Sequence, residues 1–321
     1  MKDLKFLLNQ AQRVRLEAAL HDLMALAPAA ASAVAVGDTI PVNNKDCILK
    51  GHETLDQDGE VVAKRCGVVE WVDNLVYVRI LEARYNKPEV GDIIVGRVIE
   101  ITLEHWSLEI NFRHDAILML SSMNLPDGIQ KKRTAVDELN MRSILEENDV
   151  VCLEVIRGVQ HGGSPHLQAW GQKNGKLERG QLLMVPAYLV KRRKQHFHHL
   201  EQYDVDLILG CNGFIWIGEH VAVGEKTKLM GDHHEISTEA ANFNPLERRN
   251  HICRLANAVR VLSALGFTLT AELIIETVEA SSSSDIAIND MLGAEFFVQT
   301  AEREAKRRTD LVRKIDRARS C

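Results

Sequence analysis

The chain has 321 residues, of which 45% are hydrophobic and 26% are charged; this composition excludes a disordered protein, and the length favours two or three folded domains. Its formal net charge is −6. Because phosphate contacts dominate the affinity of proteins for nucleic acids, we expect such an acidic chain to bind RNA through local basic patches, with help from partner proteins.

The cysteines and the apolar segments indicate an intracellular protein without a membrane span. The six cysteines contain no CxxC pair, so they lack the close spacing of zinc ligands, and we expect reduced thiols. The alanine-rich run at residues 23–36 follows the acidic residues Asp3, Glu17 and Asp22 rather than a short basic start, which argues against a signal peptide. No segment reaches the roughly 18–20 apolar residues that a membrane-spanning helix requires.

The first third of the chain predicts a helical leader and a small β domain. Residues 1–33 form the leader and a linker, because leucines recur at helical spacing until Pro28 ends the pattern. Residues 34–88 contain short β-rich runs separated by Asp, Asn and Gly, which is typical of a small sheet.

Residues 89–172 predict a small closed β barrel of the oligonucleotide-binding type. Short β-branched runs alternate with long loops, as in such barrels, at residues 93–101, 107–110, 116–120 and 150–156. A helix is plausible over residues 136–145, and residues 166–170 and 181–185 supply either a further strand or the exit from the barrel.

Residues 173–280 predict an α+β domain, and residues 281–321 a linker followed by a charged helical tail. We expect helices over residues 187–198, 250–265 and 271–280, strands over 205–209 and 214–217, and a serine-rich linker at 281–284. The predicted fold class is therefore mainly β with an α+β C-terminal part.

The barrel carries three candidate RNA-binding residues. Barrels of this type hold single strands by stacking bases on aromatic rings and by placing cations along the phosphates. Trp106 is the candidate ring, and Arg97 and Arg113 are the candidate cations. The alternative for Trp106 is a place in the core, since an isolated tryptophan more often packs than binds a base.

A second candidate is the basic run of Lys191, Arg192, Arg193 and Lys194. Four consecutive cations repel one another, so part of the run must face solvent or a polyanion such as RNA. A solvated helix face and a nuclear-localisation signal are the alternatives. The neighbouring His198 and His199 cannot both face one ion from a helix, so we predict no metal site.

The third candidate is the run of Gly210, Cys211, Asn212 and Gly213. A GxxG loop of this kind can clamp a nucleic-acid backbone, which makes Gly210, Asn212 and Gly213 candidate RNA-binding residues. The flanking runs are strand-like, however, and Asn-Gly between strands is first of all a hairpin turn.

Motifs for catalysis are scarce. The sequence has no P-loop, no nucleophile elbow and no HExxH cluster, so it favours binding over chemistry. We predict no catalytic residues and no cofactor.

Several blocks together resemble the ribosomal RNA-processing protein 4 family of eukaryotic exosome cap subunits. The resemblance runs in collinear order over roughly residues 34–265. The blocks are VGDTI at 36–40, GH at 51–52, RY at 84–85, VGDIIVGRV at 90–98, LMLSSMNLP at 118–126, DELNMR at 137–142, LVKR and HFH at 189–192 and 196–198, and ILGCNGFIWI at 208–217.

The resemblance implies an N-terminal β domain, an S1-type OB-fold barrel and a KH-type domain. Its members are non-catalytic, RNA-binding subunits that sit on a ring of RNase-PH-like subunits and guide RNA into a complex that degrades it from the 3′ end. It implies RNA, the ring subunits and other cap subunits as partners, no membrane, an obligate hetero-oligomer, and a location in nucleus, nucleolus and cytoplasm. A translation or ribosome-associated factor and a nuclease with its own active site are the alternatives.

Overall fold

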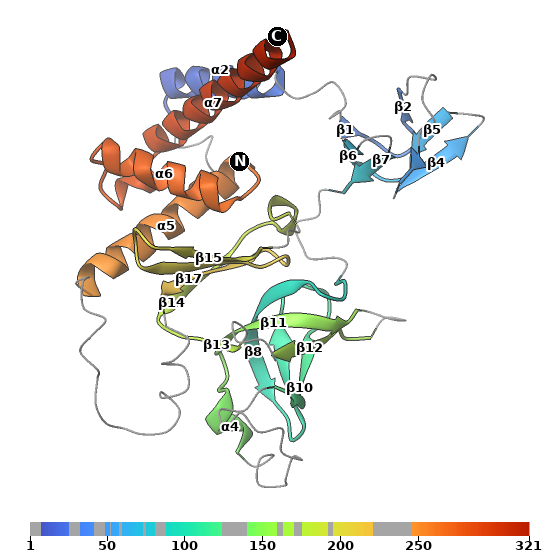
Figure 1. The fold of residues 1–321 in the computed structure, drawn as a ribbon, viewed down its shortest axis with the longest axis vertical. Helices are drawn as coiled ribbons and strands as arrows, with labels where there is room; N and C mark the ends of the chain where they lie inside the picture. The colour runs from blue at the N-terminus through green and yellow to red at the C-terminus, as the bar shows by residue number, and fades with distance from the viewer. Residues whose placement is uncertain are drawn as a thin grey trace. The chain divides into compact units, whose positions relative to one another are not determined.

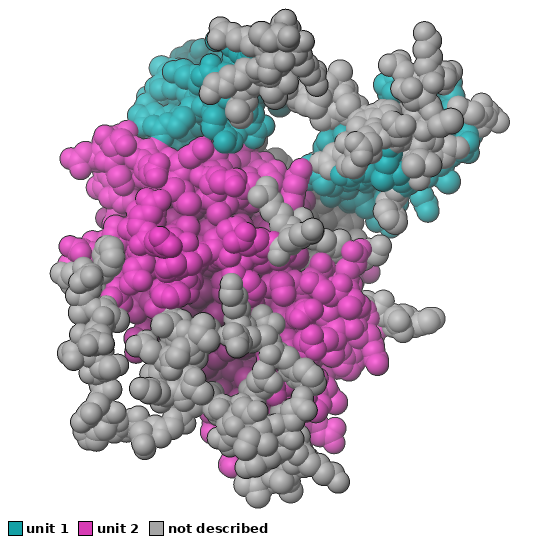
Figure 2. Space-filling model, in the orientation of Figure 1, with its two compact units in different colours: residues 1–82, 293–321 teal, residues 83–292 magenta. Residues whose placement is uncertain are grey.

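The computed structural model divides the chain into two compact units, residues 1–82 with 293–321 and residues 83–292 (Figure 2). None of the helices within the described residues is long and apolar enough to cross a membrane. The structure describes residues 8–25, 33–41, 49–51, 53–57, 60–72, 75–80, 88–123, 140–158, 163–169, 175–191, 195–220 and 245–320.

The β part of the first unit contains two small sheets among its described residues. One has the order β2 (Thr39–Ile40), β5 (Glu60–Ala63), β4 (Thr54–Gln57); the other has the order β1 (Ala33–Val34), β6 (Gly67–Val72), β7 (Leu75–Arg79), β3 (Leu49–Lys50). Alternate residues of β5 and β7 are buried, which is the two-residue period of a strand with one covered face. Val61, Val69, Val76 and Val78 belong to one shared apolar core.

The helical part of the first unit pairs the two ends of the chain. The helix α2 (Gln10–Ala25) lies along α7 (Ala294–Ser320) (Figure 1). Arg15 on α2 forms ion pairs of 2.8 Å with Glu295 and Glu302 on α7. Hydrogen bonds from Arg15 hold the pKa of both carboxyl groups below their ordinary value. The leader and the tail, which sequence reasoning treated separately, therefore contact each other.

In the second unit, five strands close into a barrel. Their order is β12 (His166–Ala169), β10 (Ala116–Met123), β9 (His105–Glu109), β8 (Ile93–Ile101), β11 (Val150–Arg157), and β11 pairs in turn with β12. The second half of β11 pairs with β12, while its first half pairs with β13 (Gly175–Leu177). The predicted closed barrel is therefore present.

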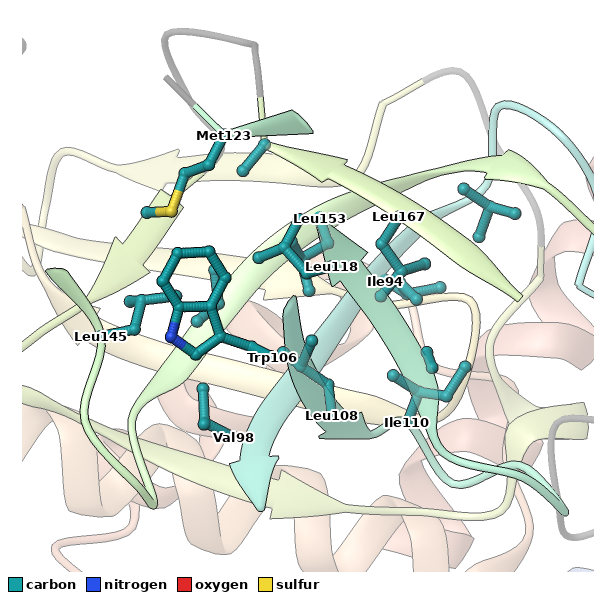
Figure 3. Packing of buried hydrophobic residues seen from close by; sticks show 14 of the residues in the cluster. Ile94, Val98, Trp106, Leu108, Ile110, Leu118, Met123, Leu145, Leu153 and Leu167 are labelled. Carbon is teal, nitrogen blue, oxygen red and sulfur yellow. The ribbon is translucent and has the colours of Figure 1, made fainter. Parts of the chain in front are cut away.

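The barrel interior is filled by alternate residues of its strands. Trp106 and Leu108 on β9, Leu118 on β10 and Leu153 on β11 have no exposed surface (Figure 3). The short helix α4 (Met141–Ile144) and Leu145 after it add to the same core. This helix is the described part of the one predicted over residues 136–145, and residues 136–139 lie outside the described residues.

The second sheet of this unit is covered on both faces. Its antiparallel order is β14 (Gly180–Met184), β17 (Phe214–Glu219), β16 (Val205–Leu209), β15 (Phe197–Leu200). On one face, Ile208, Phe214 and Trp216 pack against Val95 and Cys152 of the barrel. The helix α5 (Pro245–Leu265) covers the opposite face and packs in turn on α6 (Ala271–Ser283). Burial from both sides explains why β16 and β17 have almost continuous apolar sequences.

Two predictions about this region are wrong. Residues 187–198 were expected to be helical, but the described residues of this range contain a 3₁₀ turn, η1 (Ala187–Leu189), and the start of β15, which is extended because residues 197–200 pair with β16. The expected linker at 281–284 is mostly helix. Hydroxyl groups of Ser281, Ser282 and Ser283 donate hydrogen bonds to carbonyl oxygens of the preceding turn, which lets α6 continue through them. The predicted tail helix is present as η2 (Asp290–Leu292) and α7.

Candidate nucleic-acid interface

The loop at residues 210–213 is the tight turn that joins β16 to β17. The Gly210 N–H donates to the Phe214 carbonyl oxygen at 3.0 Å, and the Gly213 N–H donates to the Gly210 oxygen at 3.0 Å. Gly213 has a φ of 83°, a conformation that favours glycine, and a Cβ there would collide with the Val185 carbonyl oxygen. The hairpin that the sequence favoured over a helix-flanked loop is confirmed.

Asn212 in this turn inserts its carboxamide between two barrel strands. The side chain is fully buried, and its Nδ2 group donates to the Val95 oxygen at 2.7 Å and to the Ile110 oxygen at 3.0 Å. Its Oδ1 atom accepts from the Val95 N–H at 3.4 Å. The paired register of β8 and β9 ends at Arg97 and Glu109, so Asn212 bridges the strands just past the point where their own ladder stops.

Two further hydrogen bonds hold the turn on the barrel. The Asn111 Nδ2 group donates to the Asn212 carbonyl oxygen at 2.8 Å, and the Cys211 N–H donates to the Ile93 oxygen at 3.0 Å. Asn111 is itself buried and has a φ of 57°. The turn therefore attaches the second sheet to the barrel, and we call this set of hydrogen bonds the fastening.

The expectation that Gly210, Asn212 and Gly213 contact RNA is wrong for this structure. All three residues are buried, and the polar groups of Asn212 are engaged by the barrel. A clamp on an RNA backbone needs exposed N–H groups that the phosphates can reach. Here the glycines serve a close approach between two parts of the same chain.

The expectation that Trp106 stacks on a base is also wrong. Its side chain has no exposed surface and lies among Val98, Leu108 and Leu145 inside the barrel (Figure 3). Its indole N–H is buried and has no hydrogen-bond partner among the described residues. Trp106 fills the core, which was the alternative that the sequence left open.

The candidate cations lie on the surface as far as they are described. Arg97 projects from β8 and forms an ion pair with Glu109, its cross-strand neighbour on β9. Arg113 is exposed in the loop between β9 and β10, and Lys191 is exposed just after η1. Arg192, Arg193 and Lys194 lie outside the described residues. A phosphate approaching Arg97 must compete with Glu109, whereas Arg113 offers its charge from a loop.

Sequence reasoning missed a group of polar residues on the second sheet. His199, Asp206 and His220 gather there, although the His-rich run had been judged unable to bind a metal. That judgement assumed a helix, whereas β15 is a strand. Alternation along the strands and their register supply the missing signal, because they decide which of the adjacent histidines faces Asp206.

The barrel and the sheet fastened to it define a protein with S1 and KH domains. The family model described as the S1 domain of RRP4 matches residues 84–157, and the KH domain model matches residues 180–223. The second match covers the sheet from β14 to β17 and contains the Asn212 turn.

Three curated relatives show how far the similarity extends. The exosome complex component RRP4 homolog of Arabidopsis thaliana is 57% identical over 316 residues, which cover 96% of this chain and 98% of that protein. Exosome complex component RRP4 of Mus musculus is 40% identical, over 79% of this chain and 83% of that protein. The RRP4 protein of Saccharomyces cerevisiae is 32% identical, over 73% and 72%.

The chain therefore belongs to the exosome RRP4 family. The resemblance seen in the sequence blocks is confirmed, and so is the predicted fold class, mainly β with an S1-type barrel and a KH-type α+β part. The domain boundaries predicted from the sequence remain predictions.

Replacing Asn212 tests the fastening. The substitution Asn212→Ala leaves the buried Val95 and Ile110 carbonyl oxygens without their partner, so we expect the free energy of unfolding to fall by about 2–4 kcal/mol. Urea unfolding of the full-length chain measures this change.

The matched control is Asn140→Ala. Asn140 is exposed and its side chain forms no capping hydrogen bond, so this substitution should change the stability by less than about 0.5 kcal/mol. Equal losses in the two variants would show that Asn212 does not fasten the sheet to the barrel.

Proposed function

We infer that this chain is a non-catalytic, RNA-binding cap subunit of the RNA exosome, the complex that degrades and trims RNA from its 3′ end. The observation that carries this inference is the 57% identity, over 96% of the chain, to a protein named as an exosome component. The S1 barrel and the KH domain support it, because both are modules that bind single-stranded RNA.

RNA is held by cations rather than by the Asn212 turn. Because that turn is buried, the phosphate contacts fall to Arg113 and to the run from Lys191 to Lys194, with Arg97 as a weaker contact that Glu109 partly neutralises. Such contacts are independent of base sequence and allow the strand to slide. A sliding strand suits a subunit that passes RNA to a nuclease elsewhere in the complex.

The net negative charge of the chain lowers its affinity for RNA outside an assembly. With a net charge of −6, the isolated protein repels RNA at long range, so the basic positions act best beside those of partner subunits. The proposed partners are the RNase-PH-like ring subunits and the other cap subunits, in an obligate hetero-oligomer. The proposed locations are nucleus, nucleolus and cytoplasm.

Co-purification tests the assembly. Full-length chain with an affinity tag, isolated from its own cells under native conditions, should bring down a ring of RNase-PH-like proteins and two further cap subunits, as identified by mass spectrometry. Recovery of ribosomal subunits instead would favour a translation or ribosome-associated factor. Recovery of the chain alone, with RNA-shortening activity of its own, would favour a nuclease.

The salt dependence of RNA affinity tests the basic run. Changing Lys191, Arg192, Arg193 and Lys194 together to Ala should reduce the slope of log affinity against log salt by up to about 2.8, since each contact to a single strand contributes about 0.7. The affinity of single-stranded RNA for the assembled complex is measured at several salt concentrations.

A control variant loses the same number of charges elsewhere. Arg142, Arg303, Lys306 and Arg313 are exposed, and changing all four to Ala should leave the slope close to that of the unmodified protein. A slope that is unchanged in the first variant, or reduced equally in both, would remove the basic run from the RNA path.

A further inference from the structure

Three side chains with metal-binding atoms gather at the surface of the second sheet. The Nδ1 atoms of His199 and His220 both lie 2.9 Å from Oδ1 of Asp206, and the ligand atoms of all three residues lie within 4.8 Å of one another. Each side chain is about one-third exposed. No described RNA-binding candidate belongs to this group, which we call the His-Asp-His cluster.

Strand register brings the His-Asp-His cluster together. His199 on β15 is the direct cross-strand partner of Asp206 on β16, so the two side chains share a face of the sheet. On the other side, Asp206 is paired with Gly218 of β17, where the Trp216 indole lies in the place of a side chain. His220, two residues further along, contacts the Asp206 carboxylate from the diagonal position.

We propose that the His-Asp-His cluster binds one divalent transition-metal ion of the Zn²⁺ class. Two imidazole nitrogens and one carboxylate oxygen are ligands that zinc accepts, whereas magnesium and calcium prefer oxygen alone. Tetrahedral bonds of about 2.1 Å place neighbouring ligand atoms roughly 3.4 Å apart. The two separations of 2.9 Å from Asp206 need to open by about half an ångström, and the two histidine nitrogens, which lie within 4.8 Å of each other, need to come to roughly 3.4 Å, which partly exposed side chains allow.

The two imidazole rings also lie side by side, with their centroids 4.1 Å apart. One dication held between them would face the carboxylate of Asp206, which both rings contact. The protein contributes three ligands, and solvent completes the coordination, which is the arrangement of an open zinc site.

The bound ion would cross-link β15, β16 and the end of β17 at one end of the sheet. It links β15, β16 and the residue that follows β17, all of which belong to the sheet that Asn212 fastens to the barrel. This inference does not rest on RNA binding or on assembly into the exosome. A failure of the metal site therefore leaves the proposed function standing, and the reverse also holds.

Metal titration of the full-length chain tests the site. Protein stripped with a chelator and kept reduced, with any affinity tag removed, should bind Zn²⁺ at one equivalent per chain by calorimetry. Co²⁺ used as a spectroscopic probe should give an absorption spectrum without thiolate charge-transfer bands, which separates the cluster from the exposed Cys66 and Cys253. Mg²⁺ should not compete.

Variants assign the ligands. Asp206→Asn and His220→Gln should each weaken Zn²⁺ binding by at least about tenfold. Replacing a residue that only hydrogen-bonds to a metal ligand already lowers metal affinity by about 10- to 100-fold, so the loss of a ligand itself should cost no less. His114→Gln, which changes an exposed histidine of the barrel, should bind as the unmodified chain does. Equal binding in all variants, or absence of a one-to-one site in the unmodified chain, would overturn the proposal.

A second measurement uses the unmodified chain, so its outcome does not depend on whether a variant folds. In the unmodified chain, Zn²⁺ should shift the imidazole proton resonances of two histidines, and a Co²⁺ sample should broaden the same two. If no histidine resonances respond, or if the responding ones belong to residues outside the His-Asp-His cluster, the site does not exist.

Discussion

The carboxamide of Asn212, held between two strands of the S1 barrel, is the interaction on which the arrangement of the larger unit depends. Its hydrogen bonds to Val95 and Ile110 act as a further rung of the ladder between β8 and the segment after β9. Because Asn212 lies in the turn from β16 to β17, the same bonds fix the second sheet on the barrel. The apolar contact around Trp216 then excludes water from the joint, which strengthens those bonds.

This fastening changes how the protein can bind RNA. In a KH domain that grips RNA through a GxxG loop, the glycines leave backbone N–H groups open to phosphates. Here the corresponding turn is occupied by the chain's own barrel, so its glycines serve close packing instead. In the proposed function, RNA binding falls to cations such as Arg113 and Lys191, which are exposed. Contacts of such cations to phosphates do not depend on the base sequence.

Local patterns predicted much of this fold, and long-range contacts account for what they missed. Strand periodicity found the barrel, and Asn-Gly between apolar runs found the β16–β17 turn. Nothing local shows that Asn212 meets Val95, which lies 117 residues earlier. For Trp106 the sequence leaves base stacking and core packing open, because its environment depends on strands from four other segments. The prediction of no metal site at His199 rests on a helix, whereas His199 lies on a strand and its partners come from β16 and from the residue after β17.

The claim that Asn212 makes the barrel and the second sheet one body is tested most directly by their relative orientation in solution. Residual dipolar couplings, measured on deuterated full-length chain, report the orientation of each backbone N–H bond. If the two parts form one body, a single alignment tensor fits the strands β8 to β12 and the strands β14 to β17 together. Two clearly different tensors, with the unmodified protein correctly folded, would contradict it.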